Sequence, residues 1–381
     1  MASEITGLVG QFGQVKRALQ DHGSFLPATM EEPPEEPQPP DVDKMEDNAN
    51  FDEANLCFNA ESVIEPDRPY IYPGAPLPRV ECNFFRQFID GSIRTYYLGE
   101  QIEGNRAYPV MATEVATAVI QREEDGHPRV QSFRRRIALL VPSCPPVSDD
   151  TWKDLLKLKG SFDRSSFKYR LEVVPLEREE QHEGVDLRTS LAGKARSIMH
   201  DLEYDSAMEL DRSDDDWLIL DGAIRKTKFL RLKNAIGLAK SFSRKPVFSI
   251  EGRKVRDVVS LLSALKEGHR TIVFKRKIQR GEAEDPVKRG VSFWYLRLRS
   301  GKGLQGPLQG IVKIDLHLPY ASLENKHIEQ VNLISRALMA EKYVSPYPTP
   351  RWHAHIYPIY VAETYIKSSM LTPVVFRGYF G

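Results

Sequence analysis

Apolar residues near the start of the chain recur at the spacing of an amphipathic helix. Ile5, Leu8, Phe12, Val15 and Leu19 fall three or four positions apart, so a helix with 3.6 residues per turn places them on one side. Two glycines in this stretch make a stable isolated helix unfavourable. We therefore predict an N-terminal amphipathic segment at residues 1–29 whose apolar side docks into a groove of a partner, with packing on the chain's own domain as the alternative.

Residues 30–66 have a different composition. This stretch is acidic and proline-rich and contains few apolar residues, so it buries too little apolar surface to offset the entropy lost on ordering. We interpret it as an extended, solvated linker. The alternative is that its acidic run mimics DNA or occupies a basic groove.

The remaining residues, 67–381, alternate between patterns typical of strands and of helices. The pattern predicts strands at 84–98, 110–121, 136–141, 169–175, 217–220, 271–278, 291–298 and 310–318, and helices at 152–158, 187–210, around 236–239, and at 255–265, 327–343 and about 350–369. Strands followed by a helix and then a further strand favour an α/β domain with a mixed sheet flanked by helices. With 41% hydrophobic residues, the chain contains enough apolar surface for a buried core.

Charge gives no overall indication of a nucleic-acid partner, because 53 basic residues balance 53 acidic ones. Basic residues do cluster at 134–136, 225–233 and 275–277. A DNA-binding channel requires such residues, and aromatic side chains among them, here Phe229 and Phe274, can stack on unpaired bases. The cluster that directly follows Asp221 is the strongest candidate for binding DNA, although a solvated surface is the more common reason for such a run. Its basic residues are Arg225, Lys226, Lys228, Arg231 and Lys233.

The three cysteines, Cys57, Cys82 and Cys144, form no Cys-x-x-Cys pair. The N-terminus does not combine a basic start with an apolar run, and no apolar stretch approaches the roughly 20 residues needed to span a bilayer. We expect a cytoplasmic protein in a reducing compartment, with no structural zinc site and no membrane segment.

Two aspartates have the sequence context of metal-binding carboxylates. Asp90 in FFRQFIDGS and Asp221 in DWLILDGA each follow an apolar strand and precede a glycine. Hydrolysis of a phosphodiester with the help of metal ions needs hard oxygen ligands on rigid elements, and glycine allows a close approach of a ligand to the backbone. The alternative for each Asp-Gly pair is an ordinary turn.

A third carboxylate is expected from the helix at 187–210. Glu203 lies on the same side of this helix as Met199 and Leu202, and an acidic residue on an inward face needs a reason to be there. A surface glutamate at the edge of the apolar stripe is the alternative. Glu209 is the next candidate on this helix.

Four blocks of sequence together resemble the NurA family of nucleases. They are FIDGS, the helical glutamate ahead of LILDGA, NAIGLAKS, and YPTPRWHAHIYPIYVAET, and they span residues 84–367 in the family's order. The resemblance implies an RNase H-like α/β fold and a Mn²⁺- or Mg²⁺-dependent nuclease acting on DNA ends and single strands. It further implies a homodimer that works with a HerA-type hexameric ATPase in DNA repair or anti-phage defence.

The resemblance also implies roles for individual residues. Asp90, Glu203 and Asp221 become the metal-binding carboxylates, and the eight-residue spacing between the family's tyrosine and histidine selects Tyr347 and His355.

The resemblance matches Lys240 in GLAKS to a family lysine. Its ammonium group can stabilise charge that develops on the phosphate, and the alternative is a lysine that caps the end of a helix. His355 can bind metal or carry a proton to the leaving oxygen, and the alternative is a packed core histidine. Pro358 departs from the expected pattern, because a proline inside the last helix should kink it or restart it.

Two other functions stay open at this point. One is a catalytically inactive RNase H-like adaptor that binds DNA and docks a motor ATPase, which would not need three convergent acids. The other is a glycosidase with a carboxylate pair, which the lack of a sugar-binding aromatic platform near either Asp-Gly pair weakly disfavours.

Overall fold

The computed structural model describes residues 2–28, 57–60, 69–143, 145–164, 169–181, 185–224, 227–242, 244, 247–250, 253–275, 291–300, 306–318, 325–343 and 354–377. Most of the linker expected at 30–66 lies outside these ranges. Its described part, Cys57–Ala60, is strand β2, which pairs with β10 and β13.

The described strands form one fifteen-stranded sheet in the order β11-β10-β2-β13-β14-β15-β9-β8-β4-β5-β6-β7, with β1 beside β4, β12 beside β14 and β3 beside β12. The strands are β1 Ser24–Pro27, β2 Cys57–Ala60, β3 Tyr70–Ile71, β4 Phe85–Glu103, β5 Arg106–Arg122, β6 Pro128–Pro142, β7 Leu171–Leu176, β8 Trp217–Asp221, β9 Ala235–Ala239, β10 Val247–Ile250, β11 Arg253–Asp257, β12 Arg270–Thr271, β13 Phe274–Lys275, β14 Val291–Arg297 and β15 Ile311–His317. The α-helices are α1 Ala2–His22, α2 Asp149–Asp163, α3 Leu187–Met208, α4 Val258–Ser263, α5 Asn325–Glu341, α6 Tyr357–Ser369 and α7 Pro373–Arg377. The predicted α/β class with a mixed, helix-flanked sheet is confirmed.

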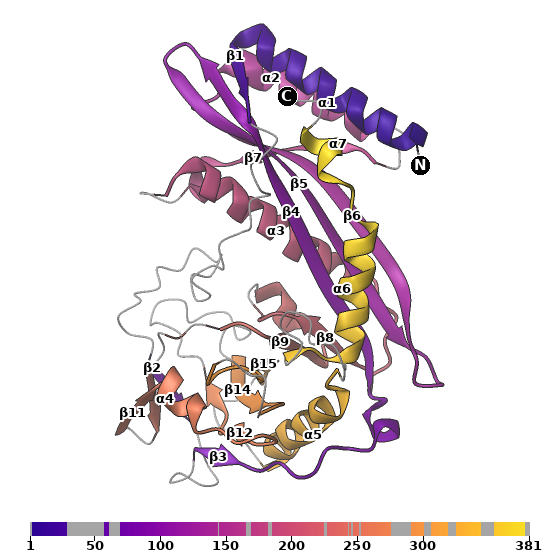
Figure 1. Cartoon of the computed structure of the whole chain (residues 1–381), viewed down its shortest axis with the longest axis vertical. Helices are drawn as coiled ribbons and strands as arrows, with labels where there is room; N and C mark the ends of the chain where they lie inside the picture. Colours follow the sequence, from indigo (N-terminus) through magenta and orange to yellow (C-terminus); the bar gives the residue numbers. More distant parts are fainter. Residues whose placement is uncertain are drawn as a thin grey trace.

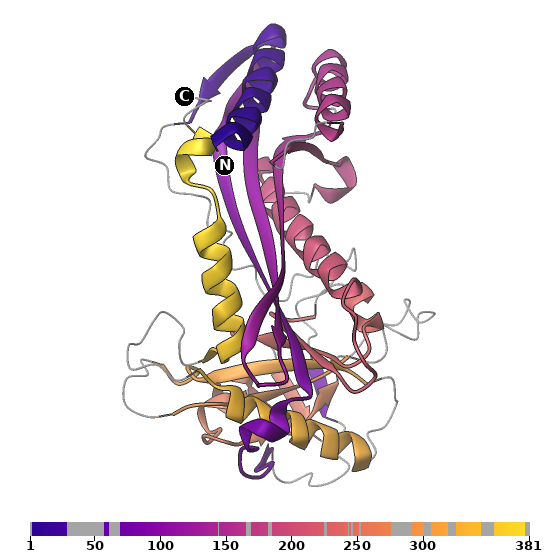
Figure 2. The ribbon, with the colours of Figure 1, turned by 90° about the vertical axis from the view of Figure 1, so that its right-hand side faces the viewer.

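Three long antiparallel strands, β4, β5 and β6, run along most of the molecule (Figure 1). Helices α3 and α6 lie on opposite faces of these strands (Figure 2). Strand β8 pairs in parallel with β4, and β9 pairs in parallel with β8. Because successive side chains of a strand point to opposite faces, neighbouring residues of β4 face different helices.

The N-terminal helix α1 packs on its own chain, at the end of the molecule where α2 and α7 also lie (Figure 1). Its residues Leu8, Phe12, Val15 and Leu19 are fully buried and belong to a core cluster shared with β4, β5, β6, α2 and α7. The apolar side predicted from the sequence is therefore used internally, so it does not supply a docking face for a partner.

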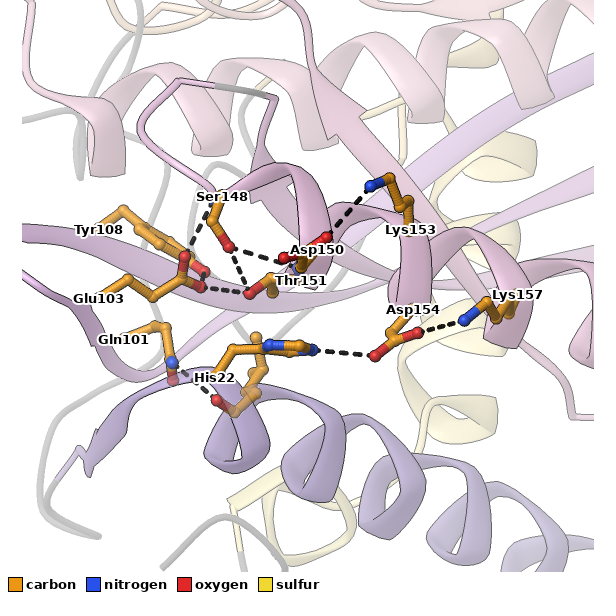
Figure 3. A network of polar contacts seen from close by, with 11 residues as sticks. His22, Gln101, Glu103, Tyr108, Ser148, Asp150, Thr151, Lys153, Asp154 and Lys157 are labelled. Carbon is orange, nitrogen blue, oxygen red and sulfur yellow. Dashed lines mark hydrogen bonds and ion pairs between the residues drawn. The ribbon is translucent and has the colours of Figure 1, made fainter.

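Polar contacts fasten α1 and α2 to the end of the β4–β5 hairpin (Figure 3). The Glu103 carboxylate accepts hydrogen bonds from Tyr108 Oη at 2.5 Å, Thr151 Oγ1 at 2.8 Å and the Ser148 backbone N–H at 2.9 Å. Burial alone would raise the pKa of Glu103, but these hydrogen bonds outweigh burial and hold the pKa below its ordinary value. The network joins the hairpin to the N-terminus of α2.

Two local predictions are wrong. Residues 235–239 form strand β9 rather than a helix, and all five are buried; a continuous apolar run of this length does not distinguish a fully buried strand from a helix. Pro358 does not kink the last helix, because α6 begins at Tyr357 and the proline occupies its first turn, where the missing N–H has no intrahelical partner to lose.

None of the helices in the described ranges is both long and apolar enough to cross a bilayer.

Candidate functional site

Asp90 and Asp221 meet on neighbouring parallel strands. In the pairing of β4 with β8, Ile89 lies opposite Leu220, so the two aspartates follow at the next position of each strand. Asp221 ends β8 as predicted. Asp90 does not end its strand, since β4 continues through Gly91 to Glu103 and Asp90 pairs with Ala118 of β5.

The turn after Asp221 is fixed by close backbone contacts. Gly222 has a φ of +110°, a conformation that favours glycine, and its N–H donates to the Leu238 carbonyl at 2.9 Å. Two residues on, the Ile224 N–H donates to Asp315 Oδ2 at 3.1 Å. A side chain on Gly237 would place its Cβ 2.8 Å from the Gly222 carbonyl oxygen. The turn at Asp221-Gly222 therefore fixes where β8 ends and where the Asp221 side chain lies.

The carboxyl groups of Asp90 and Asp221 lie side by side, and that of Asp221 is the more exposed, at 20%. Asp90 is only 4% exposed. Burial, the charge of Asp221 and a hydrogen bond to Asp221 hold the pKa of Asp90 well above its ordinary value. The charge of Lys240 opposes this shift without cancelling it, so the ionised form of Asp90 is one that an added cation would favour.

Lys240 lies beside this pair, directly after strand β9. Its Nζ donates to Asp221 Oδ2 at 2.8 Å, and its side chain is only 5% exposed. Its charge also acts on Asp90 and on Glu363. The expected alternative of a lysine capping a helix does not apply, because no helix ends here; the ammonium group lies among three carboxylates.

Glu363 of α6 is a member of this site that the sequence reasoning missed. Its charge acts on Asp90, and its Oε2 lies 3.5 Å from His355 Nδ1. Burial would raise the pKa of Glu363, but Lys367, Lys240 and His355 together hold it below the ordinary value. The only signal in the sequence was an acid two turns of helix after His355, within the block that carries the family resemblance.

His355 lies just before α6 and is 3% exposed. Its carbonyl oxygen accepts from the Tyr343 N–H at 2.8 Å, and its ring lies edge-on to that of Tyr360. His355 lies next to the site because its Nδ1 is 3.5 Å from Oε2 of Glu363. Tyr347, its expected companion, lies outside the described residues.

Glu203 lies on the face of β4 opposite to that of Asp90, next to Gly91, the residue that follows Asp90. An added Cβ on Gly91 would lie 2.3 Å from Glu203 Oε1, so the Glu203 carboxylate faces Gly91, whereas Asp90 faces the side of α6. Its Oε2 lies 2.9 Å from Nδ1 of His200, one turn earlier on α3. The other helical candidate, Glu209, forms an ion pair with Arg134 instead.

The edge of β4 is open where Asp90 and Glu203 flank it. Strand β8 ends at Asp221, and among the described strands the next one on this edge is β1, which joins at Gly99. At Gly91 the described strands pair with β4 on one edge alone, that of β5, so the acids on the two faces of β4 both border the other, unpaired edge.

Two of the five basic residues in the run after Asp221 form ion pairs. Lys228 pairs with Asp201, and Lys233 lies 2.7 Å from Asp214. Arg231 is exposed. Arg225 and Lys226 lie outside the described residues. The lysines of this run that the structure describes are thus bound to acids of the same chain.

The predicted stacking aromatics and the cluster at 134–136 do not form an open surface. Phe229 is 5% exposed and Phe274 is fully buried, so neither ring is available to a base. In the cluster at 134–136, the three arginines pair with Glu209, Glu114 and Glu172 in turn.

Asp90 and Asp221 fit part of a divalent cation site. They offer two hard carboxylate oxygens whose mutual repulsion a cation relieves, and Mg²⁺ is commonly bound by one or two carboxylates together with substrate phosphates. Within the described ranges, no three His, Cys, Asp or Glu side chains are gathered closely enough to form a complete metal site. The donor set therefore suits a cation shared with a substrate better than one held by protein alone.

No protein-family model and no curated protein sequence matches this chain. The geometry of the site thus carries the functional argument, together with the sequence blocks that resemble NurA.

Proposed function

We propose that the chain is a metal-dependent deoxyribonuclease that hydrolyses phosphodiester bonds at the site of Asp90 and Asp221. The observation that carries this proposal is the placement of these two aspartates at neighbouring positions of the paired strands β4 and β8, with Lys240 donating to Asp221. Placing two carboxyl groups side by side where one of them is buried costs folding free energy, and such arrangements are concentrated at functional sites. A divalent cation with a bound phosphate matches the charge and the oxygens of this pair.

Asp90 and Asp221 are the residues that would hold Mn²⁺ or Mg²⁺, with Glu203 as a further carboxylate at the open edge of β4. When bound, such a cation polarises a phosphate oxygen and makes a bound water a better nucleophile. Lys240 keeps Asp221 in place and supplies positive charge where negative charge develops on the phosphate.

His355 and Glu363 have complementary roles in moving a proton. The Glu363 carboxylate lies 3.5 Å from His355 Nδ1 and thereby favours a ring that is oriented and protonated. His355 then gives a proton to the leaving oxygen from its other nitrogen. Glu363 acts through His355 and is a positioning residue in this scheme.

The mixed order of strands supports an RNase H-like core as part of the proposal. An antiparallel meander, β4-β5-β6, is continued on its first strand by the parallel strands β8 and β9, with one helix on each face and acids where the neighbouring strands meet. The resemblance to NurA extends the proposal to a homodimer and to a HerA-type hexameric ATPase as partner. If such a partner binds, its docking surface is one other than the buried apolar side of α1.

The decisive assay incubates the purified chain with end-labelled single-stranded and duplex DNA in Mn²⁺, in Mg²⁺ and in EDTA. We expect cleavage with either cation and none in EDTA. Binding of DNA without cleavage under all conditions would instead support the inactive DNA-binding adaptor, and neither binding nor cleavage would refute both functions.

A further inference from the structure

Three tyrosines form a stacked group next to His355. The ring centroids of Tyr343 and Tyr360 lie 4.3 Å apart with 16° between the ring planes. Tyr357 is nearly parallel to Tyr343, at 13°, with its centroid 6.0 Å away. Tyr343 follows α5, whereas Tyr357 and Tyr360 are in the first turn of α6. We call these three residues the tyrosine stack.

The tyrosine stack connects directly to the candidate site. The ring of Tyr360 meets that of His355 edge-on, with centroids 6.3 Å apart, and the Tyr343 N–H donates to the His355 carbonyl. His355 in turn contacts Glu363, whose charge acts on Asp90. The stack therefore lies on the same side of the sheet as Asp90, at the start of the helix that carries Glu363.

The ring of Tyr357 is not required for packing α6 onto the core. The core side of α6 is formed by other residues, Ile359, Ala362 and Ile366, which are fully buried. Tyr357 is 38% exposed, so the aromatic group ends at a ring that is open to solvent. A large aromatic side chain in this position presents a flat surface that a planar ligand can extend.

We propose that the tyrosine stack binds an unpaired nucleobase of a DNA strand whose phosphate is at the Asp90–Asp221 site. This inference rests on the proposed nuclease function and adds a base-binding subsite to it. Every base presents a π-face, so stacking on tyrosine is tolerant of sequence. Bases in a duplex are already stacked on one another, so the tyrosine stack favours single-stranded ends over paired DNA.

Basic groups beside the tyrosine stack match the charge of a strand. Arg299 donates to the Tyr343 carbonyl, and Lys342 forms a backbone bridge with Ile356 and lies 3.4 Å from Glu267. The Lys342 side chain is 31% exposed. Because Lys342 shares its charge with Glu267, these two groups add little to the case, which stands on the stacked rings.

The test measures binding of fluorescein-labelled oligothymidylate by anisotropy in EDTA, which prevents cleavage. Tyr357→Ala is expected to raise the dissociation constant about tenfold, in the range that loss of one stacked base produces, while Tyr357→Phe binds like the unaltered chain. Tyr365→Ala is the matched control, because Tyr365 is 39% exposed on the same helix and packs only at its edge against Phe133. It should leave the affinity unchanged.

A second probe separates stacking from charge. On an abasic strand with the same number of phosphates, Tyr357→Ala should bind as the unaltered chain does. An equal loss on both strands, or no loss on oligothymidylate, overturns the inference. If the unaltered chain cleaves DNA and Tyr357→Ala has no effect, only the stacking site is refuted; if the unaltered chain neither binds nor cleaves, the nuclease proposal fails with it.

Discussion

Replacing Gly91 by alanine tests whether the position of Glu203 matters to the site. The new Cβ would lie 2.3 Å from Glu203 Oε1 and 3.1 Å from Met199 Cγ, whereas ordinary contacts begin near 3.4 Å. The Glu203 carboxylate must therefore retreat by about 1 Å, and a misplacement of about 1 Å in a catalytic group can cost about 100-fold in rate. Its hydrogen bond to His200 resists the movement.

The expected effect on stability is smaller than the effect on activity. Overpacking costs about 1–3 kcal/mol, but the atom in closest contact is the end of a flexible side chain, and alanine is by itself favoured over glycine within a strand by about 0.5–1 kcal/mol. We expect Gly91→Ala to lose about 1 kcal/mol in the free energy of unfolding and about 100-fold in the cleavage rate. Urea denaturation and single-turnover cleavage of labelled DNA measure the two quantities.

Gly193→Ala is the control for this experiment. Gly193 lies in the same helix as Glu203, and nothing lies within 4 Å of a Cβ added there, so this variant should be up to about 1 kcal/mol more stable and fully active. Cleavage by Gly91→Ala at the unaltered rate would refute the reasoning, since Glu203 would then tolerate displacement without consequence.

Three further predictions concern the core around Phe12, the polar network of Glu103, and the contact between His355 and Glu363. Phe12→Ala should lower the free energy of unfolding by about 3–5 kcal/mol, because Phe12 is fully buried against Phe376 and the rest of the α1 cluster; a loss below about 1 kcal/mol in a denaturant titration would show that α1 is not part of the core. Tyr108→Phe should cost about 1–2 kcal/mol at neutral pH by removing a hydrogen bond to the Glu103 carboxylate. The lowered pKa of Glu103 means that its stabilising contribution is present above the ordinary carboxyl pKa and is lost as pH falls through the native one, so the difference between Tyr108→Phe and the unaltered chain should narrow in acid; a difference that does not change with pH would contradict this. Glu363→Gln should slow cleavage about 100-fold and move the alkaline limb of the pH–rate profile to lower pH, because a neutral amide no longer favours the protonated ring of His355; an unshifted limb would remove Glu363 from the proton-moving pair.

The sequence was informative where patterns are local. The β-rich runs at 84–98 and 110–121 and the apolar run before Asp221 predicted the strands that carry the site. The short, fully buried β9 was interpreted as a helix, because a strand buried on both faces shows no alternation. Because residues 235–239 were predicted as a helix, Lys240 was considered as a helix cap. It instead follows strand β9, and its Nζ donates to Asp221 Oδ2.

Contacts between segments that are far apart in the chain could not be predicted from the sequence. Glu363 reaches Asp90 only because α6 crosses the face of β4 that Asp90 occupies, and no spacing within the chain indicates which face that is. The ion pairs of Lys228 and Lys233 are of the same kind, since their acidic partners lie about 20 or more positions earlier in the chain. The sequence therefore did not indicate that Lys228 and Lys233 are paired with acids of the same chain.

The most direct test of the account compares cleavage by Asp90→Ala, Asp221→Ala and the unaltered chain in Mn²⁺, with all three purified identically. Either substitution removes a proposed oxygen ligand and leaves the surrounding strands in place, so we expect cleavage to fall to background while the unfolding transition stays cooperative. Metal-dependent cleavage at an undiminished rate by either folded variant would contradict the assignment of this pair as the catalytic site.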